Sequence, residues 1–226
     1  MKLILFDIDG TLLHTDGLSK DLFFESISET FSVPINPGNI PWGGLTDKGI
    51  AEFALRESGV NQARIEAKLP DAFRLLGEKW ANQGSVDHFT IYPEAVRFLQ
   101  QLAAEPEIKL AILTANCQQG AEHKLRIADL EHHFDFLVTG DLVSDRDDLP
   151  PFAFNRAYAG SGHRFVAEDC IVIGDTPADI ACAKAHGMQA VAVATGRYSR
   201  EQLAEHQPDV LLSDLTPSVA LSHLNY

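Results

Sequence analysis

Five short apolar runs, each about the length of a β-strand and separated by helical patterns, constrain the fold of this chain more than any other feature. They are Leu3–Phe6, Leu110–Leu113, Ile171–Ile173, Ala190–Ala194 and Val210–Leu212. Their apolar residues are nearly continuous rather than alternating, as is typical of strands buried on both faces of a parallel sheet. Strands that alternate with helices predict an α/β fold, a doubly wound parallel sheet with right-handed crossovers.

Apolar residues at helical spacing predict the helices that connect these strands. One such pattern covers Glu94–Ala104 and another covers Gly120–Phe134. A further helix is predicted to start at Thr176-Pro177, because a hydroxyl side chain that can cap the helix precedes a proline at the first helical position.

Residues 17–88 interrupt the alternation, because they contain helical patterns and no convincing strand. The three patterns are Leu22–Phe31, Gly49–Ser58 and Ile65–Ala81. Tyr92-Pro93 marks the return to the alternating pattern. We therefore expect a small helical domain over residues 17–88, inserted into an α/β core formed by residues 1–16 and 89–226.

Composition restricts the partners. Of the 226 residues, 45% are hydrophobic and 22% charged, which are ordinary values for a globular protein. The 18 basic and 32 acidic residues give a formal net charge of −14. A surface this acidic repels phosphate backbones and anionic lipids, so we expect no nucleic-acid or membrane partner. A small anionic substrate remains compatible if a metal ion or local cations reverse the charge in one pocket.

The three cysteines indicate the compartment. Cys117, Cys170 and Cys182 are odd in number and lack the spacing of metal ligands, so a disulfide scaffold is excluded and a reducing cytoplasm is expected. No apolar run approaches the roughly 18 residues of a membrane helix. The first apolar run meets Asp7 too early for a signal peptide. We expect a soluble cytoplasmic protein, and the sequence carries no signal for its oligomeric state.

Two acidic residues directly follow the first predicted strand. Because the carboxyl ends of strands line the crevice of a parallel sheet, and residues i and i+2 share one side of an extended chain, Asp7 and Asp9 can face one ligand. A solvated acidic turn is the alternative. A calcium loop is excluded, because Gly10 is fourth and Leu18 twelfth where that loop needs glycine at the sixth position and glutamate at the twelfth.

Three further segments end strands or precede helices. Thr114 ends the strand Leu110–Leu113, and its hydroxyl with the following backbone N–H groups suits phosphoryl oxygens. Thr176 and Asp179 fit a variant capping box, which leaves Asp175 at the end of a buried strand unexplained. Arg146 is a lone cation among acids before a helix, which alone is typical of a surface loop.

Together these segments resemble the haloacid dehalogenase superfamily of phosphohydrolases, in order and through nearly the whole core. DIDGTL at residues 7–12 resembles the first motif, Thr114 the second and GDTPAD at residues 174–179 the fourth. LTAN at residues 113–116, GAEHKL at residues 120–125 and the helical insertion resemble the phosphoglycolate phosphatase-like branch. The resemblance implies a Rossmann-like core, a helical cap and hydrolysis of a small phosphorylated metabolite, such as phosphoglycolate or a sugar phosphate.

The resemblance also implies the roles of the acids. Asp7 is expected to attack phosphorus and form an aspartyl-phosphate. Asp9 is expected to protonate the leaving group and then to activate water. Mg²⁺ is expected to be held by Asp7, Asp175 and the backbone carbonyl of Asp9. Asp179 is expected to hold the metal ion or Arg146 in position without contacting the substrate.

The phosphoryl oxygens are expected to be bound by Thr114, by the backbone N–H groups of Ala115 and Asn116, and by a cation of the third motif. The family usually has lysine there, whereas this chain has Arg146. Lys124 is the reserve candidate, although its place within a helical pattern suggests a solvated face.

The remaining expected substrate contacts come from the first motif and the cap. They are Gly10 and Thr11, and the cap segment WGGLTD at residues 42–47, in which Trp42 and Thr46 are the leading candidates. A packing role for Trp42 between cap and core is the alternative.

Related activities remain as alternatives. A dehalogenase would need a non-acidic residue in place of Asp9, and a phosphonatase would need a cap lysine that forms a Schiff base. A phosphosugar mutase would return the phosphoryl group to its substrate. A non-catalytic Mg²⁺-dependent phosphoacceptor domain would need neither the insertion nor Asp9.

Overall fold

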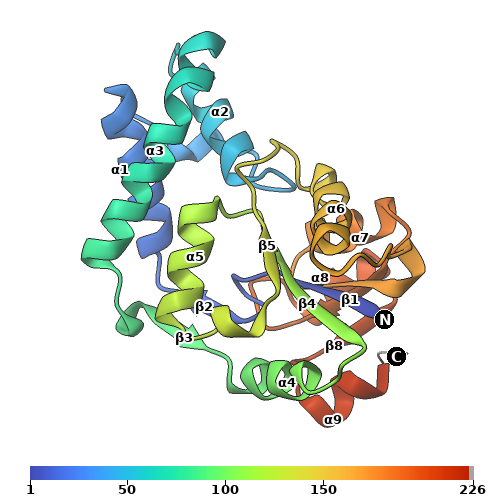
Figure 1. Ribbon diagram of the computed structural model, residues 1–226. Helices are drawn as coiled ribbons and strands as arrows, with labels where there is room; N and C mark the ends of the chain where they lie inside the picture. Colours follow the sequence, from blue (N-terminus) through green and yellow to red (C-terminus); the bar gives the residue numbers. More distant parts are fainter. Residues whose placement is uncertain (224–226) are drawn as a thin grey trace.

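The computed structural model describes residues 1–223, and its centre is a six-stranded parallel sheet in the order β5-β4-β1-β6-β7-β8 (Figure 1). The strands are β1 (Lys2–Phe6), β4 (Ile108–Leu113), β5 (Phe136–Val138), β6 (Cys170–Gly174), β7 (Gln189–Val193) and β8 (Val210–Leu212). The sheet continues to one side of β1 through β4 and β5 and to the other through β6, β7 and β8. The predicted doubly wound α/β fold is therefore confirmed, and the strand order reverses at β1, where ligands of such sheets bind.

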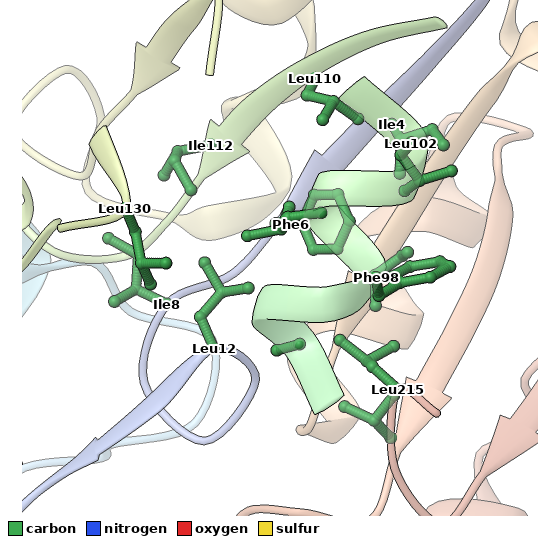
Figure 2. Close-up of a cluster of buried hydrophobic side chains, with 14 of the residues drawn as sticks. Ile4, Phe6, Ile8, Leu12, Phe98, Leu102, Leu110, Ile112, Leu130 and Leu215 are labelled. Atoms are coloured by element: carbon green, nitrogen blue, oxygen red, sulfur yellow. The ribbon is translucent and has the colours of Figure 1, made fainter. Parts of the chain in front are cut away.

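Helices cover both faces of the sheet. One face carries α4 (Pro93–Ala103), α5 (Gln118–Ile127) and α9 (Pro217–Ala220), and the other carries α6 (Pro150–Ser161), α7 (Pro177–Ala185) and α8 (Arg200–Glu205). Alternate residues of β1 supply the two cores, with Ile4 and Phe6 in one and Leu3 and Leu5 in the other. Figure 2 shows Phe6 against Phe98 of α4 in the first core. Burial on both faces explains why the strand sequences are continuously apolar.

A helical segment lies between two short strands that the sequence patterns did not predict. Its helices are α1 (Leu18–Phe31), α2 (Asp47–Glu57) and α3 (Gln62–Gln83), which share a hydrophobic core of their own. The flanking strands, β2 (Leu13–Thr15) and β3 (Phe89–Ile91), pair antiparallel and bring the two ends of the segment together. In Figure 1 these helices gather on one side of the molecule, with α3 beside α5.

The pattern over Gly120–Phe134 is wrong as a prediction of one continuous helix. The helix α5 ends at Ile127, and Asp129 adopts a left-handed backbone with φ +55°. Leu130 N–H donates to Leu125 O at 2.8 Å, which closes the turn and buries Leu130. A short 3₁₀ turn and then β5 follow.

The three cysteines, Cys117, Cys170 and Cys182, are unpaired and buried. Within residues 1–223, none of the helices combines the length and the apolar character that crossing a bilayer requires.

Candidate active site

The first motif forms a tight turn at the carboxyl end of β1. Asp7 is buried, and its N–H donates to Ile173 O of β6 at 2.9 Å. Gly10 has φ +85°, and a Cβ at this position would lie 2.4 Å from Asp175 Oδ2. Only glycine combines this backbone with such a close approach. The turn therefore brings Asp175, from the end of β6, against the first motif.

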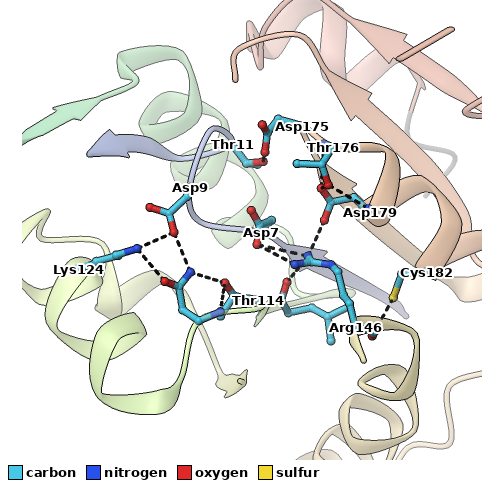
Figure 3. Close-up of polar contacts among 12 residues, drawn as sticks. Asp7, Asp9, Thr11, Thr114, Lys124, Arg146, Asp175, Thr176, Asp179 and Cys182 are labelled. Atoms are coloured by element: carbon cyan, nitrogen blue, oxygen red, sulfur yellow. Dashed lines mark hydrogen bonds and ion pairs between the residues drawn. The ribbon is translucent and has the colours of Figure 1, made fainter. Parts of the chain in front are cut away.

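Arg146 is buried between Asp7 and Asp179, with 4% of its surface exposed. Its Nη1 and Nη2 each donate to Asp7 Oδ1 at 3.3 Å, and Nη2 lies 2.5 Å from Asp179 Oδ1 (Figure 3). Nη2 also donates to Leu113 O at 2.9 Å. Burial lowers the pKa of Arg146, but Asp179 and Asp7 outweigh burial and raise it. The structure thus brings the Arg146 guanidinium into direct contact with Asp7 and Asp179.

Three buried carboxylates converge beside this arginine. Oxygens of Asp7, Asp175 and Asp179 all lie within 4.8 Å of one another. Burial, together with the repulsion between the acids, raises the pKa of Asp7 to about 7 and that of Asp175 to about 9. An all-oxygen donor set that holds excess negative charge fits Mg²⁺, a hard cation.

The carboxylate cluster differs from the predicted metal set in one member. Asp179 takes part, and its other oxygen accepts from Thr176 N–H at 2.9 Å and Thr176 Oγ at 2.6 Å, in the predicted capping box. The Asp9 side chain lies outside the cluster, so Asp9 contributes no carboxylate to it.

Asp9 is held by two residues of the second strand-end segment. Its Oδ2 accepts from Lys124 Nζ at 2.6 Å and from Asn116 Nδ2 at 2.7 Å. The solvated face suggested for Lys124 is wrong, because this residue is buried and its side chain points into the site. The helical pattern shows which residues share a face of α5, but not that this face borders the carboxyl end of the sheet.

The predicted phosphate-binding residues lie together around these acids. Thr114 is fully buried, and its Oγ accepts from the Asn116 backbone N–H at 3.3 Å and from Asn116 Nδ2 at 2.8 Å. Thr11 is buried and donates to Asp175 Oδ1 at 3.4 Å. Gly10, Ala115 and Asn116 line a cavity of about 1010 Å³, together with the acids and cations of the site.

The helical segment supplies the other wall of this cavity, and the aromatic residues Phe23, Phe24, Trp42 and Trp80 line that wall. Trp42 is 36% exposed and packs edge-on against Phe24, with Lys20 Nζ 5.0 Å from its ring centre. Trp42 therefore both lines the cavity and packs within the helical segment.

Thr46 is placed differently from the prediction. It is fully buried, donates through Oγ to Val143 O at 2.5 Å and accepts from Gly49 N–H at 3.2 Å. It caps α2 and ties this helix to the core instead of lining the cavity. The sequence also allows this capping role, because hydroxyl residues directly before a helix are preferred helix caps.

The adjacent Asp47 reaches across to the core. Its Oδ2 accepts from Cys117 N–H at the start of α5 at 2.8 Å, and its own N–H donates to Ala115 O at 2.8 Å. Burial raises the pKa of Asp47 to about 6. The sequence does not predict this contact between Asp47 and the start of α5, because it shows only an acidic residue in a loop.

Sequence reasoning missed Thr195 and Gly196. Thr195 Oγ donates to Gly10 O at 2.5 Å, and a Cβ at Gly196 would lie 1.7 Å from Asp175 Oδ2. Both residues lie in the loop after β7, which ends at Val193, so the rule that strand ends line the crevice could have found them.

Comparison with known proteins supplies further findings. A family model described as haloacid dehalogenase-like hydrolase matches residues 4–193. The phosphoglycolate phosphatase of Aliivibrio fischeri is 26% identical, over 93% of this chain and 92% of its own length. The pyrophosphatase PpaX of Bacillus mycoides is 25% identical, over 98% and 97%. The crystal structure of CbbY from Rhodobacter sphaeroides in complex with phosphate matches 100% of both chains, with a TM-score of 0.70 and 19% identity.

Proposed function

Because this chain belongs to the haloacid dehalogenase-like hydrolase family and its relatives are phosphatases, we propose that it is a Mg²⁺-dependent hydrolase of a small phosphorylated metabolite. The observation that carries the proposal is the buried Asp7 carboxylate at the end of β1. It faces the cavity beside Arg146 and within 4.8 Å of two further acids. A nucleophile, a cation and metal ligands therefore meet at one point.

The cofactor proposal rests on the donor set. Asp7, Asp175 and Asp179 would hold Mg²⁺, with the Asp9 backbone carbonyl as a further ligand. When bound, Mg²⁺ offsets the repulsion between the attacking carboxylate and the phosphate dianion.

The first chemical step forms an aspartyl-phosphate. An oxygen of Asp7 bonds to phosphorus while the ester P–O bond breaks, and the bonding electron pair stays on the leaving oxygen. The protonated Asp9 carboxyl gives its proton to that oxygen. Arg146, 3.3 Å from Asp7 Oδ1, is placed to neutralise charge on the phosphoryl oxygens, aided by Thr114 and the Ala115 N–H.

The second step regenerates the enzyme. The Asp9 carboxylate takes a proton from a water molecule, whose oxygen attacks phosphorus as the bond to Asp7 breaks. Phosphate leaves, and Asp9 is again protonated for the next cycle. One acid thus serves as proton donor and then as proton acceptor.

We further propose that residues 17–88 act as a cap that selects the substrate. These residues form one wall of the 1010 Å³ cavity and give it an aromatic character around Trp42. The names of two relatives suggest phosphoglycolate and pyrophosphate as first compounds to test, and the cavity volume also admits sugar phosphates.

A phosphate-release assay tests the proposal. We expect Mg²⁺-dependent release of phosphate from p-nitrophenyl phosphate and from members of a panel of phosphorylated metabolites. Asp7→Asn should abolish turnover, because an amide is a poor nucleophile. Asp129→Asn is the matched control, since the Asp129 side chain is 96% exposed and lies on a turn remote from the cavity.

Near-normal Mg²⁺-dependent turnover by the Asp7→Asn protein would refute the nucleophile assignment. Phosphate that appears only on another position of the substrate, without release, would indicate a mutase instead.

A further inference from the structure

Lys124 is an ammonium group in an unusual place. It lies within α5, its side chain is 2% exposed, and Asp9 is its ion-pair partner among residues 1–223. Burying a charged amine costs several kcal/mol unless a partner and hydrogen bonds compensate. If this side chain only filled space, an apolar residue would do so at a lower free-energy cost.

The contacts of Lys124 form a closed network with Asn116. Lys124 Nζ donates to Asp9 Oδ2 at 2.6 Å and to Asn116 Oδ1 at 2.7 Å. Asn116 Nδ2 donates to the same Asp9 oxygen at 2.7 Å and to Thr114 Oγ at 2.8 Å (Figure 3). Because an ammonium can only donate, the Asn116 amide must turn its oxygen to Lys124 and its Nδ2 to Asp9 and Thr114.

This network immobilises a side chain that stands at the cavity. Asp9 and Lys124 both line the cavity, while Asp9 sits on the turn after β1 and has no helix or strand of its own to hold its side chain. Two donors on one oxygen restrict the rotation of the carboxyl group. Proton transfer requires the donor within hydrogen-bond reach of the leaving oxygen, so this restriction bears directly on catalysis.

We propose that Lys124 is a positioning residue, which together with Asn116 holds the Asp9 carboxyl group in the orientation from which it passes a proton to the leaving oxygen. The inference rests on the proposed phosphatase activity and deepens it. In each turnover the proton moves from Asp9 to the oxygen released from phosphorus and returns to Asp9 from the attacking water. Lys124 acts through Asp9 alone.

The role has a consequence for substrate range. A good leaving group, such as p-nitrophenolate, departs without a proton, whereas an alkoxide needs one. Positioned acid catalysis contributes about 10²–10⁴-fold where it is needed. Loss of the Lys124 contact should therefore slow alkyl phosphates far more than aryl phosphates.

The test compares Lys124→Met with the wild type on both kinds of substrate. Single-turnover release of the leaving group isolates the first step from hydrolysis of the aspartyl-phosphate. For the best alkyl phosphate of the panel we expect this rate to fall by about 10²-fold, and for p-nitrophenyl phosphate by less than about threefold, with KM little changed. Lys124→Gln, which keeps a donor, should lose less.

Two further variants sharpen the test. Adding Lys124→Met to Asp9→Asn should cause no additional loss on the alkyl phosphate, because residues that act through one another are not additive. Arg126→Met is the matched control on the same helix, since Arg126 is 57% exposed and pairs with Glu131. It should leave both rates unchanged.

Equal loss on the two substrates, or a loss that adds fully to that of Asp9→Asn, would overturn the positioning role. Thermal unfolding of each variant shows whether it is folded, and Lys124→Gln carries the comparison if Lys124→Met is not. Absence of phosphate release by the wild type on every substrate would instead refute the proposed function, which is a distinct result.

Discussion

Replacing Arg146 with methionine should destabilise the protein strongly in the absence of metal. Arg146 is 4% exposed and bridges Asp7 and Asp179, both of them buried. Methionine fills a similar volume but carries no charge, so the acids of the cluster would face one another without a cation. Removing one partner of a buried ion pair costs about 3–5 kcal/mol, because the remaining charge is left uncompensated.

The size of the loss should depend on pH. Burial raises the pKa of Asp7 to about 7, and the Arg146 charge works against that rise. Without the arginine, Asp7 should take up a proton at higher pH than in the wild type. Because the pKa of Asp7 in the folded protein lies above its ordinary value, the protonated carboxyl group stabilises the fold at low pH. This stabilisation is lost as the pH rises through about 7. The deficit of Arg146→Met should therefore shrink on acidification.

Urea unfolding followed by circular dichroism measures this deficit. We expect the free energy of unfolding of Arg146→Met to be lower than that of the wild type by about 3–5 kcal/mol in EDTA above pH 7, and by less at about pH 5. Arg146→Lys keeps the charge but loses the forked contact, so it should lose only about 1–2 kcal/mol. Added Mg²⁺ should recover part of the loss by supplying positive charge.

Equal unfolding midpoints for Arg146→Met and the wild type in EDTA would refute the reasoning. A deficit that stayed constant between about pH 5 and pH 8 would also refute it, because the uncompensated carboxylates would then not be its cause.

Three further predictions concern the same region. Asp7 and Asp175, with pKa values of about 7 and 9, must lose protons to bind a cation, so Mg²⁺ should raise the Tm more at about pH 9 than at about pH 6. Gly196→Ala should displace Asp175 and weaken Mg²⁺ binding about tenfold or more by calorimetry, since its Cβ would lie 1.7 Å from Asp175 Oδ2. Asp47→Asn should raise the free energy of unfolding by about 1–3 kcal/mol at about pH 8 but not at about pH 4. Burial raises the pKa of Asp47 to about 6, so the ionised side chain destabilises the fold at high pH, whereas the amide is neutral and can still accept from Cys117 N–H.

The strands that the sequence predicts are those buried on both faces. Ile171–Ile173 lies within β6, and the predicted Ala190–Ala194 differs from β7 by one residue at each end. The strands it misses, β2, β3 and β5, have three residues each, and such short segments show no period; β8 is equally short and is predicted only from its apolar run Val210–Leu212. The end of α5 is missed for a related reason, because the left-handed turn at Asp129 leaves the apolar spacing intact while it redirects the chain.

The residues of the candidate site that the sequence predicts are likewise those that follow buried strands. Asp7, Asp9 and Asp175 are predictable because each follows a buried apolar strand, and the carboxyl ends of parallel strands meet. Lys124 is not, because it reaches the site from inside a helix whose sequence reads as amphipathic. Thr46 is misplaced because a threonine before a helix can serve as a cap or as a ligand, and only packing decides between the two.

Packing also joins the cation of the site to the helical segment. Arg146 N–H donates to Gly44 O at 2.9 Å, and Leu45 pairs with Asp145 in an antiparallel bridge. Gly49 allows this approach, since a Cβ there would lie 2.1 Å from Ser144 O. A glycine inside a helix costs about 1 kcal/mol relative to alanine, and here the close contact between α2 and the core requires it. The segment that lines the cavity and the loop that carries Arg146 are thus hydrogen-bonded to each other, so a shift of the segment would also move the guanidinium beside Asp7.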